Sequence, residues 1–204
     1  MKTFRQIFII LSVVVSTQAV AQTQNVIQAF TKSYEYEKKS DYTNAISTIK
    51  AIYDRSSYEL NLRLGWLSYE AALYKESASY YQIAEDIMPL SIEAKLGYAY
   101  PAAALGKTDE VINLYQKILE GDPQNSTVNY KLGYMYYNKK DYQSALKYFE
   151  KVVNLYPFNY DGLLMYAWTN YQLGKTREAQ VLFNKVLMLS PDDKSATQGL
   201  SLIK

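Results

Sequence analysis

Hydrophobic and polar residues alternate along this chain in a pattern that changes at regular intervals. The segment KLGYMYYNKKDYQSALKYFEKVVNLYP, residues 131–157, has small residues at Gly133 and Ala145 and rings at Tyr142 and Phe149. Spacings of three and four residues between its apolar positions place them on one face of a helix. The pattern therefore predicts two amphipathic helices, joined by a polar turn and ended by Pro157.

The prolines show that this segment is one copy of a repeat. Four of the five prolines lie 34 residues from the next, and only Pro101 is out of phase; the four are Pro89, Pro123, Pro157 and Pro191. A fixed period of this length indicates stacked structural repeats. Rows that end two residues after each proline give the units 58–91, 92–125, 126–159 and 160–193.

Small residues recur in phase with the prolines. They occupy one position in the first half of each row and one in the second half: Gly65, Ala99, Gly133 and Ala167, then Ser77, Val111, Ala145 and Ala179. Small residues let the backbones of two crossing helices approach, and the neighbouring rings fill the space beside the contact. Each row is therefore predicted to be a helical hairpin, with turns near Gly106 and Gly174.

Both ends of the array depart from the regular unit. A degenerate first unit, 26–57, has lost two residues and its proline, and the tail 194–204 is predicted to form a capping helix with Ala196, Leu200 and Ile203 on one side. Pro101, inside a predicted first helix, should remove a hydrogen bond and kink that helix. The kink is either a local bend without a role or a change of curvature within the array.

These residues resemble the tetratricopeptide-repeat family over 26–193. Leu64-Gly65 and Leu132-Gly133 match the family's Leu-Gly pair, and Tyr136 matches its tyrosine. The resemblance implies an all-α, right-handed α-solenoid of five helical hairpins and a capping helix. The large aromatic usual at the fourth position is absent, being replaced by Ala29, Asn61, Lys95, Asn129 and Leu163.

The resemblance also implies a concave wall lined by first-helix positions two, five, nine, twelve and thirteen. Position nine holds a ring in every unit, although the family commonly has a polar residue there. Together with rings at positions five and twelve, these form the candidate partner-binding groove: Tyr34, Trp66, Tyr69, Tyr100, Tyr130, Tyr134, Tyr137, Trp168 and Tyr171. Two interpretations stay open, because Tyr and Trp suit a binding groove and also half-buried packing between neighbouring helices.

The ionised groups near this wall are few and mostly acidic, and all but Asp161 lie in the first three units: Glu37, Lys38, Glu59, Glu70, Glu93 and Asp161. They are either solvated surface charges or an acidic recognition patch. A glycosidase pair is disfavoured, since nothing in a repeat array fixes two carboxylates across a sugar.

The chain has no Cys and no His, which removes the commonest metal ligands and nucleophile–base pairs. We therefore expect no catalytic residues, no metal and no cofactor.

The first residues, MKTFRQIFIILSVVVSTQAVAQTQ, have the form of a secretory signal peptide. Lys2 and Arg5 precede an apolar run, and Ala19-Val20-Ala21 is an A-x-A cleavage site, so we expect residues 1–21 to be removed. The alternative is an uncleaved anchor, but the apolar run is well short of the roughly 20 residues that span a bilayer. The product would be periplasmic or extracellular, without a membrane anchor.

Two functional classes follow from these features. The first is a non-catalytic scaffold of the cell envelope that binds an extended peptide or a partner helix. The second is a glycan-binding module of the cell wall or capsule, for which only Asn138 and Gln172 supply nearby amides. Cleavage removes Lys2 and Arg5 from a chain of formal net charge +2, so there is no electrostatic case for nucleic acid. The sequence does not specify an oligomeric state.

Overall fold

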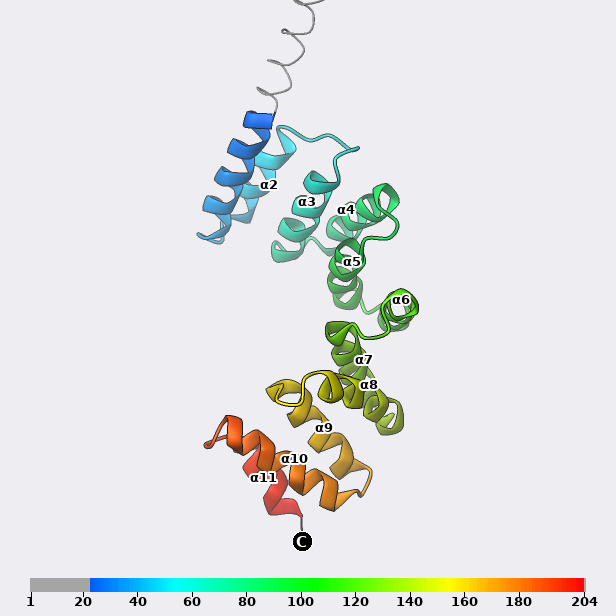
Figure 1. The fold of residues 1–204 in the computed structure, drawn as a ribbon. Helices are drawn as coiled ribbons and strands as arrows, with labels where there is room; N and C mark the ends of the chain where they lie inside the picture. Colours follow the sequence, from blue (N-terminus) through cyan, green and yellow to red (C-terminus); the bar gives the residue numbers. More distant parts are fainter. Residues whose placement is uncertain (1–22, 204) are drawn as a thin grey trace, which may run out of the picture. The chain divides into compact units, whose positions relative to one another are not determined.

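The computed structural model describes residues 23–203, which are helical throughout and contain no β-strand (Figure 1). The predicted signal peptide, residues 1–21, lies outside this described part. The helices form two compact units, one ending at Thr108 and the other beginning at Asp109. The predicted class, an all-α solenoid of helical hairpins, is confirmed.

The first unit is built from layered hairpins. A helix over residues 23–37 precedes α2 (Tyr42–Lys50), and α3 (Tyr58–Glu70), α4 (Tyr74–Ile87) and α5 (Ile92–Ala104) follow. Helix α3 packs against α4, and α5 packs against both α3 and α4. Helix α3 therefore contacts both its own partner helix, α4, and the first helix of the next layer, α5.

The second unit repeats this arrangement. It contains α6 (Thr108–Gly121), α7 (Ser126–Asn138), α8 (Tyr142–Leu155), α9 (Tyr160–Gln172), α10 (Thr176–Leu189) and α11 (Lys194–Leu202). Helix α9 packs against α7, α8, α10 and α11. The tail helix α11 buries Ala196 in the same apolar cluster as Phe183 of α10 and Ala167 of α9, with Leu200 and Ile203 packed beside it.

The start of each first helix is set by a capping residue that recurs every 34 residues. Five side-chain oxygens accept a hydrogen bond from the backbone N–H three residues on, at 2.7–3.3 Å: those of Ser57, Ser91, Asn125, Asn159 and Asp193. Such caps satisfy amides that have no partner inside the helix. Local sequence alone therefore places the helix starts.

The turn inside each hairpin contains one residue in the left-handed backbone region. The positions are in phase but only two are glycine: Ser40, Ala72, Gly106, Lys140 and Gly174, with φ between 56° and 77°. Three hairpins therefore hold a residue with a Cβ in a conformation that favours glycine.

Close helix crossings explain the in-phase small residues. Gly65 lies under the ring of Tyr81, where an added Cβ would approach the ring to 2.9 Å, and Gly133 lies in the same way under Phe149, at 2.8 Å. Both rings are buried. Helix α5 continues through the buried Pro101 to Ala104, and the kink expected there stays a prediction.

Candidate functional site

A cavity of about 900 Å³ lies in the first unit, on the face formed by the first helices of three successive layers. It is lined by the position-nine rings Tyr34, Trp66 and Tyr100, which are 49%, 36% and 40% exposed. Three of the nine candidate groove residues therefore line one open cavity. Tyr69 lies beside them, with its ring centre 6.0 Å from that of Trp66 and 5.5 Å from that of Tyr100.

The apolar lining comes from the position-five side chains Phe30, Leu62 and Leu96, which the sequence also assigned to the concave wall. Several lining residues lie outside the expected positions, among them Tyr81, from the second helix α4, and Gly97 of α5. Tyr81 is only 5% exposed. Burial raises the pKa of its hydroxyl, and the charges of Glu93 and Glu70 add to the shift.

Three carboxylates reach the same cavity. Glu37 is paired internally, whereas Glu59 and Glu93 accept hydrogen bonds only from neutral hydroxyls, those of Ser57 at 3.0 Å and Tyr58 at 3.2 Å. Within residues 23–203, no lysine or arginine forms an ion pair with either of these two. The cavity therefore carries two uncompensated negative charges.

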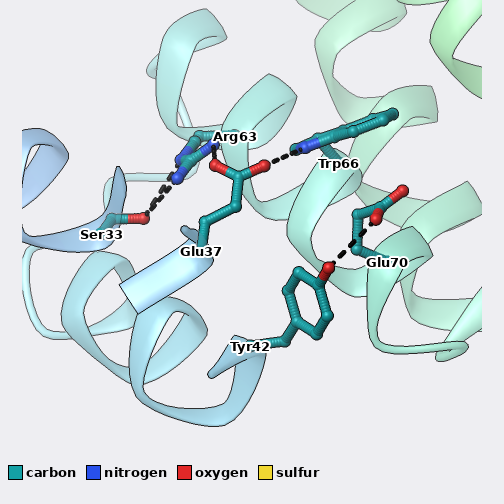
Figure 2. Close-up of polar contacts among 6 residues, drawn as sticks. All are labelled: Ser33, Glu37, Tyr42, Arg63, Trp66 and Glu70. Carbon is teal, nitrogen blue, oxygen red and sulfur yellow. Dashed lines mark hydrogen bonds and ion pairs between the residues drawn. The ribbon is translucent and has the colours of Figure 1, made fainter. Parts of the chain in front are cut away.

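Three of the cavity's lining residues, Glu37, Arg63 and Trp66, belong to a polar cluster whose contacts Figure 2 shows. Arg63, only 6% exposed, forms an ion pair with Glu37 (Nη1 to Oε2, 2.6 Å) and donates two hydrogen bonds to Ser33 Oγ. Its guanidinium carbon lies 3.8 Å from the centre of the Tyr34 ring. The second carboxylate oxygen of Glu37 accepts a hydrogen bond from the indole of Trp66 at 2.5 Å.

This cluster orients two of the cavity rings. Arg63 covers Tyr34 through a cation–π contact, and Glu37 fixes the indole plane of Trp66. Farther along, the hydroxyl of Tyr42 donates to Glu70 at 3.2 Å (Figure 2). Arg63 was missed in the sequence, although a charged residue between Leu60 and Leu64, on an otherwise apolar face, was a detectable signal.

The remaining candidate rings lie in the second unit. Tyr130 and Tyr134 stack with ring centres 6.5 Å apart and planes at 19°, and Tyr134 is 47% exposed. Tyr130 also packs edge-on against Phe149 at 5.8 Å, and burial raises its pKa. Tyr137 is half-buried against Tyr142 at 5.3 Å.

Trp168 is held differently from the other position-nine rings. It is half-buried, packs edge-on against Phe183 at 5.0 Å and against Tyr171 at 5.8 Å, and donates from its indole to Ser195 of the capping region at 2.9 Å. Trp168 thus packs against Phe183 of α10 and bonds to α11, and its assignment to a binding groove stays a prediction.

The described residues contain no cluster of three His, Cys, Asp or Glu side chains that could bind a metal ion. Among the helices of residues 23–203, none combines the length and the apolar character that a bilayer crossing requires.

Known proteins similar to this chain share its repeats. Two sequence models described as tetratricopeptide repeat match residues 99–160 and 136–201. The anaphase-promoting complex subunit 7 of Homo sapiens is 26% identical over 90% of this chain, and the chain spans only 35% of that protein's length. The subunit from Mus musculus is similar to the same extent, at 25% identity.

Solved structures also resemble it. A tetratricopeptide repeat protein from Parabacteroides merdae has a TM-score of 0.74 at 22% identity, covering 87% of this chain and 72% of that one. MamA from Desulfovibrio magneticus has a TM-score of 0.70 at 14% identity, covering 83% of this chain and 97% of that one. At these identities the likeness concerns the fold alone. The in-phase helices, the matched residues 99–201 and this common fold together show that the chain belongs to the tetratricopeptide-repeat family.

Proposed function

We propose that this chain is an exported, non-catalytic scaffold of the cell envelope that binds a protein partner. The observation that carries the proposal is the cavity of the first unit, in which three ring-bearing layers present Tyr34, Trp66 and Tyr100 around an apolar floor. Exposed aromatic side chains around a concave apolar surface are typical of protein recognition sites. An extended peptide or a partner helix is the occupant of such grooves.

Family membership supports a role in protein–protein interaction, because stacked helical repeats create extended concave binding surfaces. The similar anaphase-promoting complex subunit 7 is, by its name, part of a larger assembly. Export rests on residues 1–21 alone, with Lys2 and Arg5 before the apolar run and Ala19-Val20-Ala21 at its end. The envelope location is thus an inference from sequence.

The glycan-binding alternative receives less support. Sugar sites combine a stacking ring with planar amides and acids that bond to hydroxyls, and the described lining of the cavity supplies carboxylates but no Asn or Gln. The two amides near the groove, Asn138 and Gln172, belong to α7 and α9 of the second unit. Protein is therefore the favoured ligand class.

Site-specific photo-crosslinking tests the proposal. A photoreactive amino acid at Trp66, in the cavity, should crosslink to a protein in cells that export the chain, whereas the same group at Ser79, an exposed position on α4, should not. Replacing Trp66 by Ala should weaken binding of the captured protein by about 2 kcal/mol or more, as for aromatic hot spots. Recovery of glycan without protein would support the alternative.

Intact-mass analysis of the exported protein tests the localisation. A chain that begins at Gln22 would agree with cleavage after Ala21. A full-length chain retained in the membrane would identify the first segment as an anchor.

A further inference from the structure

The first two layers of the cavity use an arginine of the chain itself. Arg63 occupies position six of the second unit and reaches back to the first, where its guanidinium covers the Tyr34 ring at 3.8 Å and pairs with Glu37 at 2.6 Å. The same guanidinium also donates two hydrogen bonds to Ser33 Oγ. One arginine therefore contacts the face of a ring, a carboxylate and a hydroxyl group. This arrangement satisfies a buried arginine.

The next layer lacks that arginine. The residue 34 positions after Arg63 is Gly97, and a Cβ there would lie 2.1 Å from the ring of Tyr81. No larger side chain fits at this position without displacing a buried ring. Position six of this layer therefore carries no side chain, and Gly97 and the Tyr81 ring line the open cavity together with Trp66 and Tyr100.

The carboxylates around this space exceed the cations, because the cavity-lining Arg63 is already paired with Glu37. Glu59 and Glu93 line the cavity without an ion-pair partner among residues 23–203. Tyr81, a residue that is 95% buried, also belongs to the lining of the cavity. A cation that donates several hydrogen bonds and stacks on rings would complement all of these groups.

We infer that the cavity binds an arginine side chain of a partner protein, whose guanidinium takes beside Trp66 and Tyr100 the role that Arg63 takes beside Tyr34. The carboxylates of Glu59 and Glu93 neutralise its charge, and Phe30, Leu62 and Leu96 accept apolar residues next to it. Arginine fits better than lysine because its planar group stacks on rings and donates in several directions. This inference rests on the proposed function, namely that the groove binds protein.

Peptide titration followed by NMR tests the inference. The probes are acetyl-Leu-Arg-Leu-amide and its citrulline counterpart, which has the same shape and no charge, added to the isotope-labelled mature protein. The indole signal of Trp66 reports on the cavity, and that of Trp168, which is bonded to Ser195 under α11, serves as an internal control. The arginine peptide should shift the Trp66 signal at millimolar concentrations, and the citrulline peptide should bind at least about fivefold more weakly.

Charge variants complete the test. Glu93→Gln should weaken the arginine peptide about fivefold, whereas Glu150→Gln, the same change at an exposed position on α8, should leave binding unchanged. Circular dichroism of each variant verifies that it is folded. Glu59→Gln provides a second variant, should the loss of the Tyr58 hydrogen bond disturb Glu93→Gln.

Several results would overturn the arginine inference. One is equal binding of the two peptides, another is no shift with either up to about 10 mM, and a third is an arginine affinity that neither glutamate variant reduces. Each of these would leave the proposed function standing if crosslinking at Trp66 still captures a protein. Failure of that crosslink would instead count against the scaffold itself.

Discussion

The ring of Tyr81 lies directly on the backbone of Gly97, so closely that a Cβ atom on residue 97 would come within 2.1 Å of it. Tyr81 belongs to one hairpin and Gly97 to the next. Phe183 lies on Gly199 of the capping helix in the same way, at 2.2 Å. A ring on each of these second helices therefore packs against the next layer, and it can do so because glycine has no side chain at the point of contact.

Gly97→Ala should lower the free energy of unfolding by up to about 2 kcal/mol. The added methyl must displace a buried ring, which costs about 1–3 kcal/mol, against a gain of about 1 kcal/mol in helix propensity. Urea unfolding measures the change. Gly121→Ala is the control, because nothing lies within 4 Å of a Cβ there. Equal stability of the two variants would contradict the close contact.

Ala72→Gly and Lys140→Gly should each stabilise the protein by about 0.5–1 kcal/mol. Both residues have a left-handed backbone, with φ of 59° and 61°, which glycine adopts without the steric cost of a Cβ. Gly174→Ala, at the corresponding turn, should lower the free energy of unfolding by about 1 kcal/mol. Thermal melts of the three variants would refute this account if both substitutions to glycine were destabilising.

Glu37→Leu should destabilise the protein more than Arg63→Met does. The first change leaves a buried guanidinium with only Ser33 and the Tyr34 ring, at a cost of about 3 kcal/mol, whereas the second leaves a carboxylate that still bonds to Trp66 and reaches solvent. The double variant should be close to Arg63→Met alone. Strictly additive losses in urea unfolding would show that the two groups do not interact.

Trp168→Ala should cost about 2–3 kcal/mol of stability, because the ring packs on Phe183 and its indole bonds to Ser195. Tyr134→Ala should change stability by less than about 1 kcal/mol, since that ring is 47% exposed. Thermal melts compare the two. A stable Trp168→Ala variant would argue against the packing seen beneath α11.

Tyr160 and Asp193 should make stability depend on pH at both extremes. The hydrogen bond from Tyr160 raises the pKa of that phenol to about 12 and lowers the pKa of Asp193. The phenol contributes stability below about pH 10, which is lost as pH rises toward 12, and the carboxylate contributes stability above about pH 4, which is lost in acid.

Tyr160→Phe removes the contribution of the phenol and the part of the Asp193 contribution that comes from this hydrogen bond. The difference in melting temperature between this variant and the unmodified protein should therefore be largest near neutral pH and should shrink at pH 11 and at pH 3. The titration of the other tyrosines affects both proteins equally, so it cancels in this difference of melting temperatures. A difference that does not vary with pH would rule out the pair as its source.

The sequence by itself determined the hairpins and their close contacts. The 34-residue period, the small residues at Gly65 and Gly133, and the rings at Tyr81 and Phe149 place the helices and their crossings. These features are predictable because each contact lies within one hairpin and because the same residue pattern recurs in every repeat. The sequence also predicted part of the lining of the cavity, because the side chains at positions five and nine lie on one face of the first helices.

Only the tertiary structure decided what each ring of position nine does. Tyr34 is covered by Arg63, Trp66 is bonded to Glu37, Tyr134 is stacked on Tyr130, and Trp168 is packed beneath α11. The environments of Tyr34, Trp66 and Trp168 depend on side chains about 30 residues away, where the repeats differ from one another, whereas Tyr134 stacks on a residue of its own helix. The repeat pattern specifies where a ring lies along its helix, whereas the exposed fraction of that ring depends on which side chains pack against it in the folded protein.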